Sequence, residues 1–388
     1  LLAAETPGFY PYTNATSHFL YNNLQHLLVS VLYFLPSVLV LTLFSVACSL
    51  LTIMRFYQIV RLFGTPPATW LLPPLILAFS FTYWQQSEII EVYAFNNLLF
   101  VSYLYFALKD LLRKEAKNPL LVGLLLGLAL LTHIQHILAL PFFIYYLVHS
   151  FRYDSTRAVL SLGIAASLFS VMFLLPLIAG TNTFSAVFFD NQFQDDVLGL
   201  SGEVLLTGAK KALQFLVYNY HDFLPLILYS WWVCFRDRRS LFWQLLLLFV
   251  PFFGFAVKYS VSDNHVFFLI SYIVFLIPTG LALMVLGLRL LPLMNAMFPV
   301  LVVVGPLVYF MTWQYAERQN LFPDYEVNTA YKGGVEHLLW PMQTNAKDPL
   351  KLAQQIHEED PNAFERGEVE WNYPAAIALL EYREALGK

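Results

Sequence analysis

Two glutamates at a fixed spacing carry the clearest potential chemistry in this sequence. Glu88 and Glu91 lie in the run Trp84-Gln-Gln-Ser-Glu-Ile-Ile-Glu-Val-Tyr-Ala-Phe-Asn96. A positioned carboxylate can take a proton as a general base. On one helix, positions 88, 92 and 95 or 96 would share a face with position 91 beside them, so we expect both carboxylates near Tyr93 and Asn96. The alternative is a pair of solvated acids at a helix N-terminus, where the helix dipole favours them.

Imidazoles form a second group of candidates. His133 and His136 lie one turn apart, and His18 and His265 occur elsewhere in polar stretches. They could bind a substrate, or simply pack and hydrogen bond at a membrane interface. A zinc site needs three or four converging ligands. His133, His136, His265 and Asp263 could supply them, but their spacing matches no specific ligand pattern. No cofactor is firmly implied, and a divalent metal stays open as an alternative.

The composition restricts the kind of protein that must hold these residues. Of 388 residues, 58% are hydrophobic and 12% are charged, whereas a soluble domain is about 25% charged. So few charges cannot cover the surface of a large soluble core. No basic run indicates nucleic-acid binding. The two cysteines, Cys48 and Cys234, fall in different apolar segments, so we expect no disulfide between them.

Apolar segments of the length that crosses a bilayer recur along the chain. They predict about nine transmembrane helices among ten apolar segments. The segments are 37–62, 67–83, 90–109, 118–132, 137–151, 157–180, 222–236, 240–258, 265–287 and 290–312. The pieces 118–132 and 137–151 are short enough for a hairpin that does not fully span. Residues 19–35 are apolar but contain Asn22, Asn23 and His26, which suits an interfacial helix.

The distribution of Lys and Arg predicts the orientation. If the connection 109–117 is cytoplasmic, alternation places twelve of the 22 basic residues on that side: Lys109, Arg113, Lys114, Lys117, Arg55, Arg61, Arg152, Arg157, Arg236, Arg238, Arg239 and Arg289. The opposite short loops hold only Lys210, Lys211 and Lys258. This parity supports counting 118–151 as two crossings. It places 1–36, 84–90, 133–136, the long loop 181–221, 259–264 and the tail outside the cytoplasm.

The sequence therefore predicts an all-α, polytopic transmembrane helical bundle with short interfacial helices and a small polar C-terminal tail. We expect three regions: a first outer loop at 1–36, a transmembrane domain at 37–312 and an extracytoplasmic region at 313–388. The tail predicts short helices near 348–359 and 374–386. Because the sequence starts without Met and shows no signal peptide, we expect it to begin inside a longer protein.

One family is recognisable from these residues. The stretch from Trp84 to Leu98, with Glu91-Val-Tyr-Ala94 and Asn96 at its centre, resembles the signature of protein O-mannosyltransferase-like membrane proteins, a branch of the GT-C glycosyltransferase superfamily. Two weaker matches follow in order. Gly127-Leu-Ala-Leu-Leu-Thr-His133, continuing to Pro141, resembles the family's Gly-Leu…His…Pro helix. Asp263-Asn-His-Val-Phe-Phe-Leu-Ile-Ser-Tyr272 resembles another family stretch, with Ile270 in place of Pro. The resemblance covers roughly residues 1–310.

The resemblance implies a GT-C-like fold and transfer of a sugar, such as mannose, from a polyprenyl-phosphate donor. The acceptor would be a protein, lipid or glycan on the non-cytoplasmic face of a bacterial inner membrane or an endoplasmic reticulum membrane. Glu88 and Glu91 would be catalytic. The substrate-binding residues would be His18, Tyr93, Asn96, His133, His136, Asp263, His265 and Lys258. The leaving lipid phosphate would need positive charge or hydrogen bonds, from Lys210, Lys211, Lys258, His133, His136 or His265.

The sequence departs from the family at one point. The family's acidic motif after its first transmembrane helix has no counterpart here. Either the general base lies upstream of Leu1, or the chain is a divergent, inactive relative. The alternative function is therefore a non-catalytic membrane subunit or scaffold of a larger complex that retains the fold. A transporter of lipid-linked substrates is disfavoured, because few charges fall at mid-span.

Overall fold

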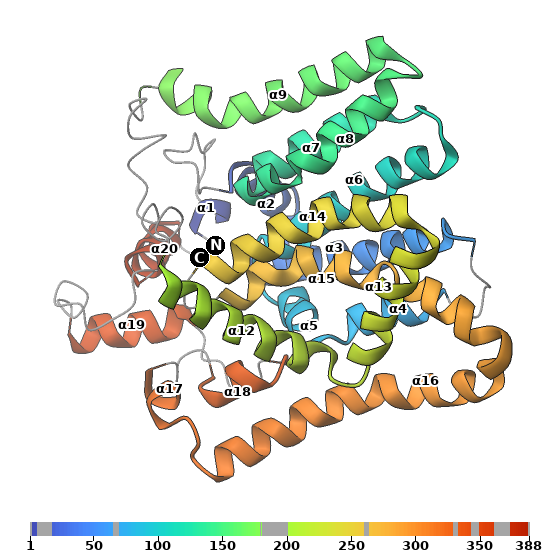
Figure 1. Ribbon diagram of the computed structural model, residues 1–388. Coiled ribbons are helices and arrows are strands. Elements are labelled where there is room, and N and C mark those ends of the chain that lie inside the picture. The colour runs from blue at the N-terminus through green and yellow to red at the C-terminus, as the bar shows by residue number, and fades with distance from the viewer. Residues whose placement is uncertain are drawn as a thin grey trace. The chain divides into compact units, whose positions relative to one another are not determined.

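The computed structural model of this chain describes residues 2–5, 18–64, 70–178, 180, 201–259, 264–328, 333–342, 349–360 and 373–386. These residues form helices and connecting turns, with no strand among them (Figure 1). The expected all-α fold is confirmed. In chain order the helices are α1 Leu2–Glu5, α2 Phe19–Val31, α3 Ser37–Arg61, α4 Leu72–Ala78, α5 Phe81–Glu88, α6 Tyr93–Arg113, α7 Pro119–Thr132, η2 Ile134–Ala139, α8 Leu140–Phe151, α9 Ser155–Ile178, α12 Gly202–Tyr220, α13 Leu224–Asp237, α14 Arg239–Lys258, η3 Asn264–Phe268, α15 Leu269–Leu276, α16 Thr279–Arg318, α17 Pro323–Asn328, α18 Val335–Leu339, α19 Pro349–Glu359 and α20 Tyr373–Ala385.

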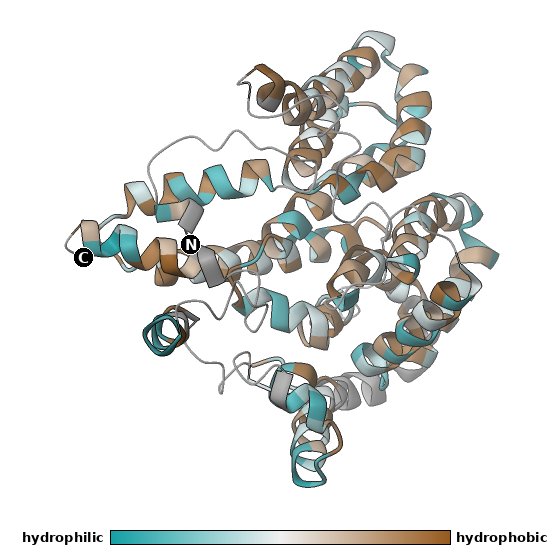
Figure 2. Cartoon of the chain, turned by 90° about the vertical axis from the view of Figure 1, so that its left-hand side faces the viewer, coloured by the Kyte–Doolittle hydropathy of each residue, from teal (hydrophilic) through white to brown (hydrophobic). Residues whose placement is uncertain are grey.

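Several of these helices can cross a bilayer. Among the described residues, five helical segments are long and apolar enough, or six if α5 and α6 form one broken span. Large apolar side chains on the outer face of α9 are more than half exposed, including Val159, Leu160 and Leu162. Figure 2 shows hydrophobic residues along many of the helices. Lipid is the environment that suits such a surface, so the polytopic membrane fold is confirmed. Helices α7 and α13, with 14 residues each, are shorter than a typical span.

The chain forms two compact units. The first combines residues 1–10, 22–44 and 307–388, and the second combines 11–21 and 45–306. In the first unit, Arg383 of α20 makes a bidentate ion pair with Glu5 of α1, at 2.9 and 2.5 Å. The hydroxyl of Ser37 also donates to Glu5. The two tail helices α19 and α20 form close to the ranges that the sequence predicts.

In the second unit, α7 packs closely against α9 (Figure 1). The contact depends on two glycines of α7. A Cβ atom at Gly127 would lie 2.7 Å from a side-chain carbon of Leu168, and one at Gly123 would lie 2.3 Å from the backbone oxygen of Ser161. Small residues let membrane helices approach each other in this way. The glycine that begins the second family-like stretch therefore has a packing role.

Three of the predicted spans have different boundaries in the structure. The segment 67–83 is not one helix, because α4 ends at Ala78 and Ser80 is extended (φ −68°, ψ 139°) before α5 begins. The segments 265–287 and 290–312 do not separate near Arg289. Their break lies at Ile277–Pro278, and α16 then continues as one helix to Arg318. Proline lacks the N–H that would continue the preceding helix but is well tolerated where a new one starts.

The predicted loop 181–221 also needs correction, because residues 202–220 form α12. The Ser201 hydroxyl accepts a hydrogen bond from the Val204 N–H and so caps its first turn, at 3.2 Å. The helix lies against α14, where a Cβ at Gly208 would approach the Val257 carbonyl oxygen to 1.7 Å. Near its end, the Asn219 side chain bonds both the backbone N–H and the hydroxyl of Thr82 in α5. Only Gly208, Ala212, Asn219 and Tyr220 of this helix are buried, and these four do not form a continuous apolar run.

Candidate functional site

The two glutamates lie on either side of a sharp break between α5 and α6. Helix α5 ends at Glu88, Ile89 is extended (φ −95°, ψ 154°), and α6 begins at Tyr93 after a bend of 117°. Consecutive β-branched residues at 89 and 90 favour such an extended turn. The prediction that residues 88, 92 and 96 share one helix face is therefore wrong. The break separates the acids from α6 and gives each its own surroundings.

Glu88 and Glu91 differ in how firmly they are held. The indole N–H of Trp84, one turn earlier in α5, donates to Glu88 Oε1 at 2.6 Å. Glu88 is partly buried. Glu91 is exposed in the turn, where its carboxylate accepts from the Val92 N–H at 3.2 Å. Glu88 is thus partly buried and bonded to a side chain, whereas Glu91 is exposed and bonded to the backbone of Val92.

Four rings from separate parts of the chain meet around His133; we call His18, Tyr93, His133 and Phe267 the ring cluster. The His133 centroid lies 5.0 Å from that of His18, 6.0 Å from Tyr93 and 6.1 Å from Phe267. His18 precedes α2, Tyr93 begins α6, His133 separates α7 from η2, and Phe267 lies in η3. The three residues that the sequence singled out here, His18, Tyr93 and His133, are brought together. Phe267 was not singled out, although it lies within the Asp263–Tyr272 stretch.

His136 and Asn96 point into the interior instead. Their side chains are 0% and 1% exposed, and His136 Nε2 lies 2.5 Å from Asn96 Oδ1. His136 also stacks on Phe100 and meets the edge of Phe252. Within the described part of the chain its Nδ1 has no hydrogen-bond partner. One turn in sequence thus separates a partly exposed imidazole from a fully buried one.

The remaining candidates lie on elements next to the ring cluster. His265 Nε2 is 2.9 Å from Gln85 Oε1 of α5. Gln135, two residues after His133, donates to the Phe267 carbonyl at 3.2 Å and so joins η2 to η3. Lys258 is the last residue of α14 and is partly buried. Asp263 lies outside the described residues.

Burial lowers the pKa of both partly exposed imidazoles in the ring cluster. For His18 the cause is loss of solvation of the charged form, opposed by its bond to the Thr132 carbonyl. For His133 the same loss is reinforced by repulsion from His18 and His136, and the pKa falls well below its usual value. Both rings are therefore neutral at pH 7 and can offer hydrogen bonds but no positive charge.

The metal alternative receives no support from the described residues, where no three His, Cys, Asp or Glu side chains converge as ligands would. His265 bonds Gln85 and His136 bonds Asn96. The expected set of His133, His136 and His265 is thus not assembled around one point.

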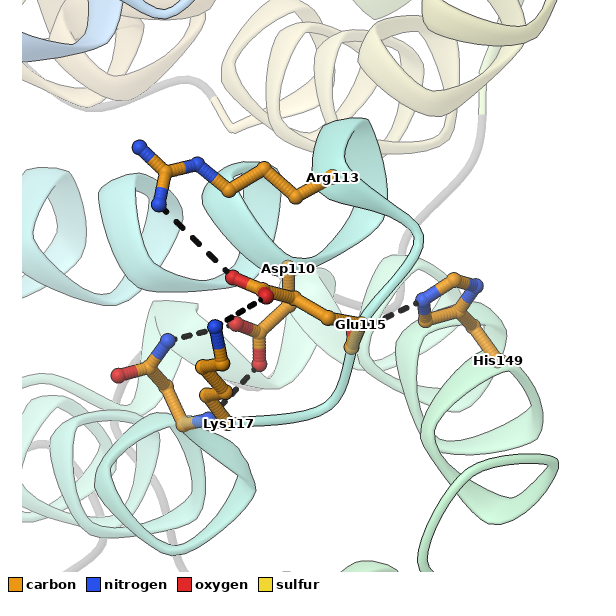
Figure 3. Close-up of polar contacts among 6 residues, drawn as sticks. Asp110, Arg113, Glu115, Lys117 and His149 are labelled. Carbon is orange, nitrogen blue, oxygen red and sulfur yellow. Dashed lines mark hydrogen bonds and ion pairs between the residues drawn. The ribbon is translucent and has the colours of Figure 1, made fainter.

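A second polar cluster joins the ends of α6 and α8 to the start of α7, where the sequence alone indicates only a basic loop. Asp110, 0% exposed, accepts from the Asn118 backbone N–H at 2.9 Å, its side chain at 2.6 Å and the Tyr146 hydroxyl at 2.8 Å. Glu115 pairs with Lys117 at 2.6 Å and lies 3.9 Å from Arg113 (Figure 3). The Asp110 contacts fix the connection between α6 and α7.

One comparison with known proteins agrees with the family resemblance over part of the chain. Residues 15–157 match the family model described as the Protein O-mannosyl-transferase TMEM260 N-terminal domain. This range includes His18, the Glu88–Asn96 stretch, and both His133 and His136. No curated protein and no solved structure matches the chain. Over these residues the chain is similar to O-mannosyltransferase-like membrane glycosyltransferases.

Proposed function

We propose that this chain, whose residues 15–157 match a protein O-mannosyltransferase domain, is a membrane glycosyltransferase. It moves a hexose, taken to be mannose, from a polyprenyl-phosphate carrier to a hydroxyl group. The acceptor is a protein, with a lipid or glycan as alternatives. The reaction takes place on the non-cytoplasmic face, where the charge distribution puts the loops that contribute to the site.

The observation that carries this proposal is the meeting of the family-like stretches at one place. The stretch around Glu88 and Glu91 supplies Tyr93 and Gln85. The stretch that ends at His133 supplies the centre of the ring cluster. The third stretch supplies Phe267 and His265, which contact those residues.

The proposed chemistry assigns different roles to the two acids. In place of a base upstream of Leu1, we assign the general base to Glu91, an exposed carboxylate. It takes the proton from the acceptor hydroxyl as the hydroxyl oxygen attacks the anomeric carbon. The bond from that carbon to the phosphate oxygen breaks, and the electron pair leaves with the polyprenyl phosphate. Glu88, oriented by Trp84, binds the sugar. Lys258 offsets the negative charge that grows on the phosphate.

The direct test is transfer of labelled mannose from polyprenyl-phosphate mannose to a peptide that contains Ser and Thr, using the full chain in lipid nanodiscs. Glu91→Gln removes the base and should lower the rate by about 10²–10⁴-fold. Glu88→Gln should also lower it, without loss of fold. Glu203→Gln is the control, because Glu203 is an exposed acid in the first turn of α12.

Two outcomes would overturn parts of the proposal. Wild-type rates in both Glu88→Gln and Glu91→Gln would reject these residues as the catalytic acids. If the wild-type chain moves no hexose from any polyprenyl phosphate, the chain is instead a non-catalytic membrane subunit.

A further inference from the structure

The backbone around His133 fixes which nitrogen of each imidazole in the ring cluster carries the proton. His133 Nδ1 accepts from the Gln135 N–H at 3.2 Å, so its proton is on Nε2. His18 Nδ1 lies 3.1 Å from the Thr132 carbonyl oxygen. Because a carbonyl can only accept, His18 carries its proton on Nδ1 and a lone pair on Nε2. The two neighbours thus have opposite tautomers.

The second nitrogen of each ring remains available. In the described part of the chain, no group bonds Nε2 of His18 or of His133, and neither atom belongs to the fully enclosed polar atoms that lack a partner. Both side chains are partly exposed. The ring centroids are 5.0 Å apart. The pair therefore offers one N–H donor and one lone-pair acceptor to the same small region.

A neutral donor beside a neutral acceptor selects for a particular kind of ligand group. A phosphate or carboxylate oxygen can only accept, and an ammonium group can only donate, so each would satisfy just one ring. An alcohol hydroxyl both donates and accepts. Burial keeps both rings uncharged, so neither offers the positive charge that would favour a phosphate.

The other two rings favour a sugar hydroxyl over an isolated one. Tyr93 and Phe267 lie 6.1 Å apart and nearly perpendicular, at 83°. Both are 8% exposed. A ligand site typically combines such apolar aromatic walls with a few placed polar groups. A pyranose has both an apolar C–H face for the walls and hydroxyls for the imidazoles.

We propose that His18 and His133 together bind one hydroxyl of the transferred hexose, which donates to His18 Nε2 and accepts from His133 Nε2–H. The pair determines specificity by recognising the sugar. Other residues bind the phosphate. This proposal rests on the proposed transferase function. The hydroxyl could come from the hexose or from a Ser or Thr of the acceptor, and the rings favour the hexose.

Substitutions of these histidines can distinguish loss of hydroxyl recognition from loss of folding. His133→Asn keeps a side-chain oxygen that can accept the Gln135 N–H, since Asn is a good N-cap residue, but it lacks the far N–H donor. His133→Gln places an amide N–H near the position of Nε2. His18→Asn keeps a donor for Thr132 and loses the far acceptor. His149→Gln is the control, because His149 lies in the second polar cluster and bonds the Glu115 carbonyl.

The experiment measures kcat/KM with polyprenyl-phosphate mannose and its 2-, 3-, 4- and 6-deoxy derivatives. With the wild-type chain, kcat/KM for one deoxy derivative should be about 10- to 100-fold lower than for polyprenyl-phosphate mannose. In His133→Asn and His18→Asn, kcat/KM for that derivative and for the parent sugar lipid should be equal, because the imidazole that binds the hydroxyl is absent. His133→Gln should recover part of the discrimination. Equal losses for all derivatives in the variants, or unchanged discrimination, would overturn the proposal.

A binding measurement distinguishes this failure from failure of the proposed function. Affinity for polyprenyl-phosphate mannose alone and for the peptide alone is measured in nanodiscs without turnover. If the sugar lipid binds in a His133-dependent way but no transfer occurs, the hydroxyl site stands and the transferase function fails. If His133→Asn weakens only peptide binding, the hydroxyl belongs to the acceptor and the proposal is wrong. Nitrogen NMR of labelled histidines should show Nδ1–H for His18 and Nε2–H for His133, and an imidazolium form at pH 7.5 would also overturn it.

Discussion

Asp110 is a fully buried carboxylate whose partners come from the start of α7 and from α8. Its removal leaves the half-buried Asn118 donors and the buried Tyr146 hydroxyl without this acceptor. Loss of a buried hydrogen-bond partner costs about 1–3 kcal/mol. Asp110→Ala should therefore lower the free energy of unfolding by about 1–3 kcal/mol, measured by thermal unfolding in detergent. Asp237→Ala, at an exposed acid paired with Arg236, should leave the transition unchanged. Equal effects in both variants would contradict the buried role.

Residue types allowed part of the ring cluster to be anticipated, but not the partners of each residue. The spacing of one turn predicts that His133 and His136 lie together. In the structure, the η2 turn directs His136 into the interior, where it contacts Asn96, a residue distant in the sequence. The tautomers of His18 and His133 likewise depend on the Thr132 carbonyl and the Gln135 N–H. Such backbone partners depend on a local turn that hydropathy does not reveal.

At the scale of elements, contact between α12 and α14 depends on the absence of a side chain at Gly208. Its Cβ would reach the Val257 carbonyl oxygen at 1.7 Å, so Gly208→Ala must push the helices apart. We expect a loss of about 1–3 kcal/mol in unfolding free energy. Gly254→Ala is the matched control in α14, since its Cβ would meet nothing within 4 Å. Alanine there should be neutral or stabilise by up to about 1 kcal/mol. A stable Gly208→Ala protein would contradict the close packing.

The pairing of α1 with α20 should depend on pH. Although burial opposes it, the hydrogen bonds from Arg383 and Ser37 give Glu5 a pKa below the usual 4.5. A carboxyl whose folded pKa is depressed stabilises the fold above its unfolded pKa, and this contribution disappears as pH falls below 4.5. Limited proteolysis of α20 should therefore accelerate between about pH 4.5 and 3. In Arg383→Ala, α20 should be cleaved equally fast at all these pH values. A wild-type pH dependence of cleavage in that variant would reject the ion pair.

Element positions followed well from hydropathy where a segment was continuously apolar. The prediction 37–62 compares with α3 at Ser37–Arg61, and 240–258 with α14 at Arg239–Lys258. The errors fall where the chain breaks or changes environment. Hydropathy does not register the extended Ser80 and Ile89 or the break at Pro278. It also missed α12, which has a mixed composition because only one of its faces is buried.

For the whole molecule, the charge parity makes a prediction about sidedness that labelling can test. The connection 109–117 should be cytoplasmic and the tail after residue 312 should be outside. Lys117 and Gln354 are exposed, and the native Cys48 and Cys234 are buried. A membrane-impermeant maleimide should label Gln354→Cys in intact cells and Lys117→Cys only after permeabilisation. The reverse pattern would invert the topology and move the proposed reaction to the other face.

The composition of the first compact unit has a consequence for the order of biosynthesis. It combines residues 22–44 with residues 307–388, so the ribosome must make the whole stretch 45–306 before the unit can close. Domains made from contiguous chain fold during synthesis, whereas distant segments must wait for each other. Helices α2 and α20 therefore cannot share a finished unit until synthesis has passed residue 373. A chain stalled before that point would expose an incomplete unit to proteases. Protease resistance of this unit therefore requires that α20 has been synthesised.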